Sequence, residues 1–194
     1  MEADSISGFS FAKAATASSP SQIEDEVVAL FERLRAPVLR YLLSFRIPVA
    51  DAEEIVQEVF LGLFQHLQKG KPRENLQGWI FKVAHNAALK QRLRIRQYRD
   101  CFSAEPGLTE SASDPNAGPE EILSDSQRQK RLLGVVQALP EREQCCLSLR
   151  AEGLRYREIA EVLGISLGAV AASLEKSLSR LRRAEQTGGT FNAL

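Results

Sequence analysis

Basic and amide side chains gather in one stretch of this 194-residue sequence, and such side chains bind nucleic acids. Between residues 69 and 99 the chain carries nine lysines and arginines against a single acid, Glu74. Basic runs are usually solvated surfaces, but so uneven a ratio on a helical segment favours a polyanionic partner. The residues expected to neutralise phosphates or to hydrogen-bond bases are Lys71, Arg73, Asn75, Lys82, Asn86, Lys90 and Arg92.

A second stretch, residues 156–183, has the residue types of a DNA-binding helix-turn-helix. Gly164 can adopt a positive φ at the end of the first helix, Ile165 can fill the gap between the helices, and Ser166 can cap the second helix. The alternative is a helical hairpin that packs only for stability. The residues expected to contact duplex DNA are Arg155, Arg157, Ser166, Leu167, Gly168, Ala172, Lys176 and Arg180.

The second helix of this motif has unusually few polar side chains that could hydrogen-bond to base edges, since it begins Gly168-Ala-Val-Ala-Ala-Ser-Leu-Glu-Lys. Its apolar residues Val170, Leu174, Leu178 and Leu181 are predicted to point inward. Glu175 would repel phosphates unless it accepts a hydrogen bond from a cytosine amino group. The sequence therefore predicts DNA contact by this helix without predicting strong binding.

A third set of polar side chains lies on one face of a predicted helix. Apolar residues from Ile55 to Leu67 recur at helical spacing and form a single stripe. The opposite face carries Glu54, Gln57, Glu58 and Leu61, and it suits docking onto a basic helical partner. Glu54 has an alternative role, because Asp51 is expected to cap this helix and Glu54 would complete a capping box.

No set of side chains predicts catalysis or metal binding. His66 and His85 lack cysteine or carboxylate partners at ligand spacing, and neither a glycine-rich phosphate loop nor a nucleophile elbow occurs. An odd number of cysteines, including the adjacent Cys145 and Cys146, is typical of free thiols in a reducing compartment. We expect no enzyme activity, no metal, no cofactor and a cytoplasmic location.

The elements that carry these residues are predicted to be helices, and the fold class is all-α with two small helical domains. The first helix is expected at residues 24–45, kinked or split at Pro37. Trp79 belongs to the apolar stripe of the third helix, so we expect it in the core. The predicted division is a disordered leader (1–21), a first domain (22–99), a flexible acidic linker (100–125), a second domain (126–186) and a tail (187–194).

Two motifs in order resemble the sigma-70 family of RNA polymerase sigma factors. Residues 51–60 (DAEEIVQEVF) resemble the polymerase-binding helix of region two, and 78–80 (GWI) with 84–86 (AHN) resemble its promoter-melting part. Residues 139–143 (LPERE) and 153–160 (GLRYREIA) resemble region four. Their order and the short linker are similar to the extracytoplasmic-function (ECF) group, over residues 24–183.

This resemblance implies a transcription initiation factor that binds bacterial core RNA polymerase and directs it to promoters. Glu54, Gln57, Glu58 and Leu61 would then bind the polymerase, with the three polar residues on the coiled coil of its largest subunit. The basic surface would capture the melted minus-ten element, and the helix-turn-helix would contact the minus-thirty-five element. An anti-sigma partner is also implied.

The alternative function is a helix-turn-helix regulator that never becomes a polymerase subunit. It explains residues 126–186 equally well, but it leaves the basic stretch at 69–99 without a purpose.

Overall fold

The computed structural model describes residues 20–101 and 119–189, with side chains placed for 20–98 and 128–186. Within those ranges the chain forms seven α-helices and no strand, which confirms the all-α prediction. The helices are α1 (Pro20–Leu43), α2 (Val49–Gln68), α3 (Leu76–Cys101), α4 (Pro119–Gln137), α5 (Glu141–Ala151), α6 (Tyr156–Leu163) and α7 (Leu167–Gly189). Most of the predicted leader and linker, residues 1–19 and 102–118, and the end of the tail, 190–194, lie outside the described residues.

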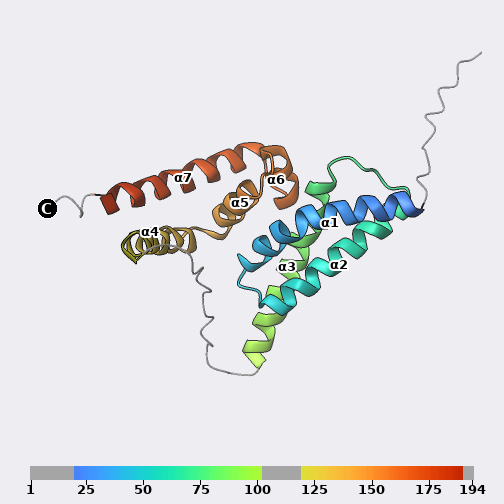
Figure 1. Cartoon of the computed structure of the whole chain (residues 1–194), viewed down its shortest axis with the longest axis horizontal. Helices are drawn as coiled ribbons and strands as arrows, with labels where there is room; N and C mark the ends of the chain where they lie inside the picture. The colour runs from blue at the N-terminus through green and yellow to red at the C-terminus, as the bar shows by residue number, and fades with distance from the viewer. Residues whose placement is uncertain (1–19, 102–118, 190–194) are drawn as a thin grey trace, which may run out of the picture.

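The helices form two bundles, which Figure 1 shows as two groups lying against each other. Helices α1, α2 and α3 pack together as the first bundle, and α4 to α7 form the second bundle, in which α7 contacts α4, α5 and α6. The two bundles also touch, chiefly through α3 and α6. We call this contact the bundle interface.

Helix α1 continues through Pro37, so the predicted split into two helices is wrong. A proline inside a helix removes one backbone hydrogen bond, and burial of the neighbouring side chains offsets that loss. Leu34, Val38 and Tyr41 are all less than 5% exposed on the two turns around the proline. Packing against the rest of the bundle therefore holds the helix together at this point.

Helix α2 buries the predicted stripe, including Ile55, Val59 and Leu63. Asp51 does not cap α2, because the helix begins two residues earlier and Pro48 occupies the cap position. The Asp51 carboxylate instead accepts a hydrogen bond from Nε2 of Gln91 in α3, at 2.9 Å. Because Asp51 does not cap the helix, the capping box predicted as the alternative role of Glu54 does not form. The Glu54 side chain is exposed.

Helix α4 begins at Pro119, so residues 119–125 of the predicted linker are helical. Proline is favoured at the first position of a helix, where its missing N–H would have no partner. Glu120 and Glu121 follow in the first turn, where carboxylates are stabilised by the helix dipole. The acidic residues that led us to expect a linker here are thus equally typical of the first turn of a helix.

Helix α7 corrects one predicted core position, because Leu178 is 45% exposed. The buried stripe runs through Val170 and Leu174 to Ser177, which is fully buried. The Ser177 hydroxyl donates a hydrogen bond to the Ser173 carbonyl at 2.8 Å. A serine hydroxyl that hydrogen-bonds within its own helix can be buried in the core. Here the serine takes the buried position that the apolar pattern predicted for the residue after it.

Candidate functional site

The predicted docking face of α2 is a continuous exposed surface. Glu54, Gln57, Glu58 and Leu61 recur every three or four residues, and Leu61 is 59% exposed. Gln57 also borders a shallow hollow between α1 and α2, beside Arg35 and Phe31. The structure therefore brings all four predicted residues onto one exposed surface, with Leu61 as its apolar member at the C-terminal end.

The basic loop between α2 and α3 exposes Lys71, Arg73 and Asn75. Arg73 forms an ion pair with Glu26 of α1, with 2.7 Å between Nη1 and Oε2. Asn75 takes a positive φ of 52° and caps α3, because its Oδ1 accepts a hydrogen bond from the Gly78 N–H at 3.0 Å. The loop is thus fixed at its C-terminal end while its basic side chains remain at the surface.

The exposed face of α3 carries Lys82, Asn86 and Lys90, which are spaced four residues apart and so point the same way. Arg92 does not join them. Its guanidinium pairs with Glu141 of α5 and lies 5.8 Å from the centre of the Phe45 ring. Arg92, predicted as a minus-ten residue, is therefore paired at the bundle interface and does not lie on the exposed basic face.

Trp79 lies in the first bundle as predicted, partly buried against the core. Its ring is 4.8 Å from the His66 ring, between centroids, and approaches Gly62 of α2. Phe81 is fully buried although the predicted stripe omitted it. Trp79 consequently anchors α3 on α2 and is not a free stacking surface.

The helix-turn-helix has the predicted local geometry. Gly164 ends α6 with φ 65° and ψ 35°, and its N–H donates to the Ala160 carbonyl. The Ser166 hydroxyl accepts a hydrogen bond from the Ala169 N–H at 3.2 Å, which caps α7. Ile165 is partly buried against the core between the helices. These contacts fix the angle at which α7 leaves the turn.

The residues predicted to contact duplex DNA are exposed, but Ser166 caps α7 and Arg180 forms an ion pair. Arg155, Arg157, Ser166, Leu167, Gly168, Ala172 and Lys176 lie at the surface around the start of α6 and the first turns of α7. Arg180 lies further along α7 and forms an ion pair with the buried Glu143, at 2.7 Å. Arg180 therefore also joins α7 to α5.

The bundle interface contains residues that sequence reasoning missed. Arg40 of α1 makes two hydrogen bonds to the Glu152 carboxylate, at 2.9 and 2.6 Å. In the buried part of the first bundle, the Tyr41 hydroxyl lies 2.8 Å from Nδ1 of His85. Arg40 and Glu152 are 112 residues apart in the chain, and no spacing rule within a single sequence pairs residues so distant.

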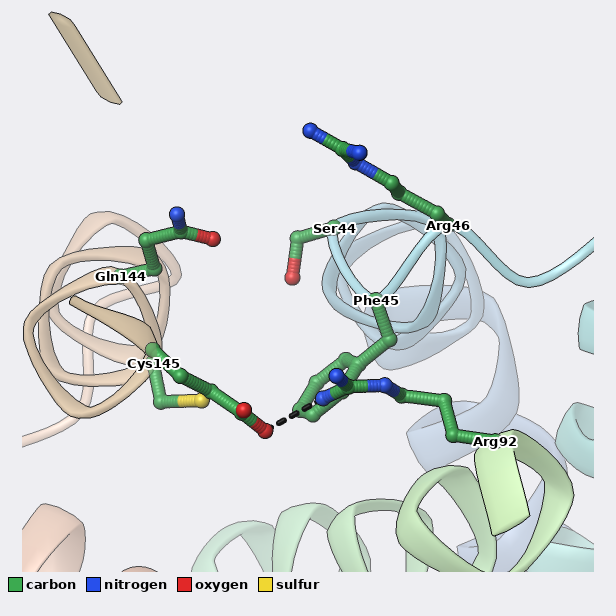
Figure 2. A pocket seen from close by; sticks show the side chains of 7 residues that line it. Ser44, Phe45, Arg46, Arg92, Gln144 and Cys145 are labelled. Atoms are coloured by element: carbon green, nitrogen blue, oxygen red, sulfur yellow. Dashed lines mark hydrogen bonds and ion pairs between the residues drawn. The ribbon is translucent and has the colours of Figure 1, made fainter. Parts of the chain in front are cut away.

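A cavity of about 250 Å³ opens at the same interface (Figure 2). Ser44, Phe45 and Arg46 line it from the end of α1, and Gln144 and Cys145 line it from α5. Figure 2 also shows Arg92 reaching from α3 to its carboxylate partner across the cavity. Burial raises the pKa of the Cys145 thiol to about 11, so this thiol is protonated near pH 7.

No group of three or more histidine, cysteine or acidic side chains in residues 20–101 and 119–189 could hold a metal ion. Over the same part of the chain, no helix combines the length and the apolar character needed to cross a membrane.

Comparison with known protein families gives two matches in the same order as the bundles. Residues 30–98 match the model of Sigma-70 region 2, and residues 129–181 match that of Sigma-70 region 4. These two ranges contain the basic loop and the docking face of α2 in one case, and the helix-turn-helix in the other.

Individual relatives agree with the family models. The ECF RNA polymerase sigma factor ShbA of Streptomyces griseus is 35% identical over 136 residues, which cover 68% of each chain. The ECF RNA polymerase sigma factor SigE of Mycolicibacterium smegmatis is 30% identical over 150 residues, which cover 73% of this chain and 55% of that relative. Among solved structures, the sigma factor RpoE of Bartonella quintana, in complex with the anti-sigma factor NepR, has a TM-score of 0.64 at 18% identity, covering 84% of this chain and 98% of that one.

Proposed function

This chain belongs to the ECF group of sigma-70 factors, and we propose that it binds bacterial core RNA polymerase and directs it to specific promoters. The observation that carries the proposal is the pair of region matches in order, each on a bundle that exposes the surface its task needs. A regulator acting without polymerase has no use for region two, so the family membership removes that alternative. The factor is a binding subunit and not an enzyme.

Binding to core polymerase is assigned to the exposed face of α2. Glu54 and Glu58 supply negative charge, Gln57 supplies amide hydrogen bonds, and Leu61 supplies an apolar contact. Charge-assisted hydrogen bonds to a basic helical partner would set the orientation, while the exposed Leu61 side chain loses water on docking.

Recognition of the minus-ten element is assigned to the loop before α3 and the exposed face of α3. Lys71, Arg73, Lys82 and Lys90 neutralise the backbone of the melted strand, and Asn75 and Asn86 can hydrogen-bond unstacked bases. Arg92 joins this surface only after it leaves Glu141, since the two residues are paired in the structure.

Contact with the minus-thirty-five element is assigned to the helix-turn-helix. We expect Arg155, Arg157, Lys176 and Arg180 to contact phosphates, and the small side chains of Gly168 and Ala172 would allow α7 to approach the base edges closely. Because this surface has few hydrogen-bonding side chains, phosphate contacts and shape should supply more of its affinity than direct base readout.

The proposed location is the cytoplasm, where the polymerase acts and where free thiols persist. An anti-sigma factor is a further proposed partner. The related fold of RpoE was solved with such a factor, and it supports this proposal at the level of the fold.

The experiment that tests the function is co-elution of the purified chain with core polymerase. We expect wild type to co-elute and a Gln57→Ala/Glu58→Arg variant to elute separately, since the substitution reverses a charge at the centre of the docking face. Glu32→Arg is the matched control, because it reverses an exposed charge on a different helix, α1. Failure of wild type to bind core, with tight binding of the free chain to duplex DNA, would refute the proposal.

A further inference from the structure

The cavity at the bundle interface is lined by two arginine side chains from different parts of the first bundle. Arg46 follows the end of α1, and Arg92 lies on α3. In Figure 2 the two side chains lie above and below the Ser44 hydroxyl, and Gln144 faces them from α5. A hydroxyl and a side-chain amide can both donate hydrogen bonds to an anion. The cavity therefore gathers positive charge and neutral donors from both bundles.

Arg46 has a backbone conformation that arginine seldom adopts. Its φ is 58°, in the left-handed region, and its N–H donates to the Leu43 carbonyl at 2.9 Å at the end of α1. Glycine is the usual residue at such a helix end, because a Cβ makes this conformation unfavourable. Strained residues of this kind are concentrated at ligand-binding and other functional sites. Among the described residues Arg46 has no ion-pair partner, so its charge is available to a ligand.

Arg92 is the second cation of the cavity, and it is already paired. Its guanidinium contacts the Glu141 carboxylate of α5, but the Glu141 side chain is 57% exposed and can turn into solvent. An ion pair this exposed contributes little stability, so an anion that binds more strongly can replace the carboxylate. The guanidinium also lies 5.8 Å from the centre of the Phe45 ring, a contact that keeps Arg92 at the cavity without Glu141.

The lining favours one class of anion. A monocarboxylate is satisfied by the fork of a single arginine, so it has no advantage over Glu141. A phosphate dianion has two charges and at least three acceptor oxygens, so it can bind Arg46 and Arg92 at once. Its remaining oxygens can accept from Ser44 or Gln144. The cavity volume of about 250 Å³ is below the range of about 300–1,000 Å³ that is usual for drug-sized ligands, so the site suits a small molecule.

We propose that this cavity binds a phosphate dianion, either inorganic phosphate or the phosphate group of a small monoester, between Arg46 and Arg92. The bound group would contact α1 and α3 of the first bundle and α5 of the second. This inference goes beyond the proposed function, because binding of the anion requires neither polymerase nor promoter DNA.

The test is isothermal titration calorimetry of the full chain at pH 8 and constant ionic strength, with three probes. Inorganic phosphate and glycerol 3-phosphate are dianions at this pH, whereas dimethyl phosphate is a singly charged diester like the nucleic-acid backbone. We expect dimethyl phosphate to bind at least about tenfold more weakly than the better dianion, because it lacks the second charge. Tighter binding of glycerol 3-phosphate would identify an organic monoester as the ligand, and equal or tighter binding of inorganic phosphate would identify the phosphate ion itself.

Three variants that each remove one positive charge locate the site. Arg46→Gly and Arg92→Gln change the cavity, and Arg94→Gln is the control, because Arg94 is exposed on α3 and does not line the cavity. We expect the first two to weaken binding of the dianion by about tenfold or more, through loss of a charge-assisted contact, and the control to bind like wild type. Glycine suits the φ of 58°, so Arg46→Gly should have a Tm equal to or above that of wild type. Its loss of affinity then cannot come from unfolding.

Three results would overturn the proposal. The first is a wild type that binds neither dianion. The second is equal affinity for dimethyl phosphate, which would indicate a site for the nucleic-acid backbone. The third is an Arg46→Gly or Arg92→Gln variant that binds as tightly as Arg94→Gln, which would indicate general charge attraction. Co-elution with core polymerase is measured separately, reports on the proposed function alone, and is independent of these results.

Discussion

Tyr41 of α1 and His85 of α3 share a buried hydrogen bond, with 2.8 Å between the tyrosine hydroxyl and Nδ1 of the imidazole. Burial lowers the pKa of His85 and raises that of Tyr41, so both groups are neutral near pH 7. With His85 neutral, the hydroxyl donates to Nδ1 in the tautomer that carries its proton on Nε2, and it accepts from Nδ1–H in the other tautomer. The pair lies under the bundle interface, beside the Cys145 thiol.

Tyr41→Phe should destabilise the protein. The variant keeps the ring but removes the hydroxyl, so Nδ1 of His85 loses its partner in a buried site. We expect a loss of about 1–3 kcal/mol in the free energy of unfolding, measured by urea denaturation. Tyr156→Phe is the matched control, because that ring is 41% exposed and its contact with Arg150 needs no hydroxyl. Equal effects of the two substitutions would refute the assigned role.

Stability should fall as the pH drops below about 6.5, the ordinary pKa of histidine. Burial lowers the pKa of His85 in the folded chain, while the nearby Glu141 opposes this shift. Between the folded and unfolded pKa values the unfolded chain binds more protons, so acid favours unfolding in that window and has no such effect above it. Urea denaturation at pH 7.5 and 5.5 measures the difference. His85→Gln should reduce it, and an unchanged difference would contradict this account.

The first expected effect of replacing Arg180 is a lower stability of the fold, ahead of any effect on DNA binding. Its partner Glu143 has a side chain only 11% exposed, and loss of the arginine leaves that carboxylate unpaired. We expect Arg180→Gln to cost about 3 kcal/mol in the free energy of unfolding, because a buried charge without its partner is strongly destabilising. The double variant Glu143→Gln/Arg180→Gln should recover most of the loss. If it recovers none, the ion pair is not the cause.

Local chemistry made much of this fold predictable. The stripe of α2, the turn at Gly164 and the cap at Ser166 all follow from spacing and residue type within one or two turns of helix. The exposure of Glu54 and Gln57 follows from the same stripe, because a helix that buries one face must expose the other. These are short-range relationships, and a single sequence contains them.

The features that could not be predicted from the sequence depend on packing between segments that are far apart in the chain. Nothing local distinguishes Arg92 from the other arginines of α3, yet α5 brings Glu141 to it and removes it from the exposed basic face. Likewise, Pro37 would break an isolated helix, but the packed neighbours of α1 keep it continuous. The contact of α3 with α6 joins segments on either side of residues 102–118, and helical periodicity within each segment does not predict how they meet.

Gly78→Ala should disturb the basic loop although alanine favours helices. An added Cβ would lie 2.3 Å from Nδ2 of Asn75, so the asparagine would have to leave its capping position. Loss of a helix cap costs about 1 kcal/mol, which urea denaturation resolves. Gly168→Ala is the control, because nothing lies within 4 Å of its added Cβ. A Gly78→Ala variant as stable as the control would show that the cap is dispensable.

Lys82 and Lys90 should each contribute a phosphate contact with the melted strand. Both are exposed on the same face of α3, so each can release a counterion when a strand binds there. Replacing either by glutamine in the reconstituted holoenzyme should reduce the slope of log affinity against log salt by about 0.7 for a pre-melted promoter fragment. Lys130→Gln, an exposed change on α4, should leave the slope as it is. If the Lys82 and Lys90 variants match that control, the exposed face of α3 does not follow the promoter strand, and the minus-ten contact must be confined to the loop that ends at Asn75.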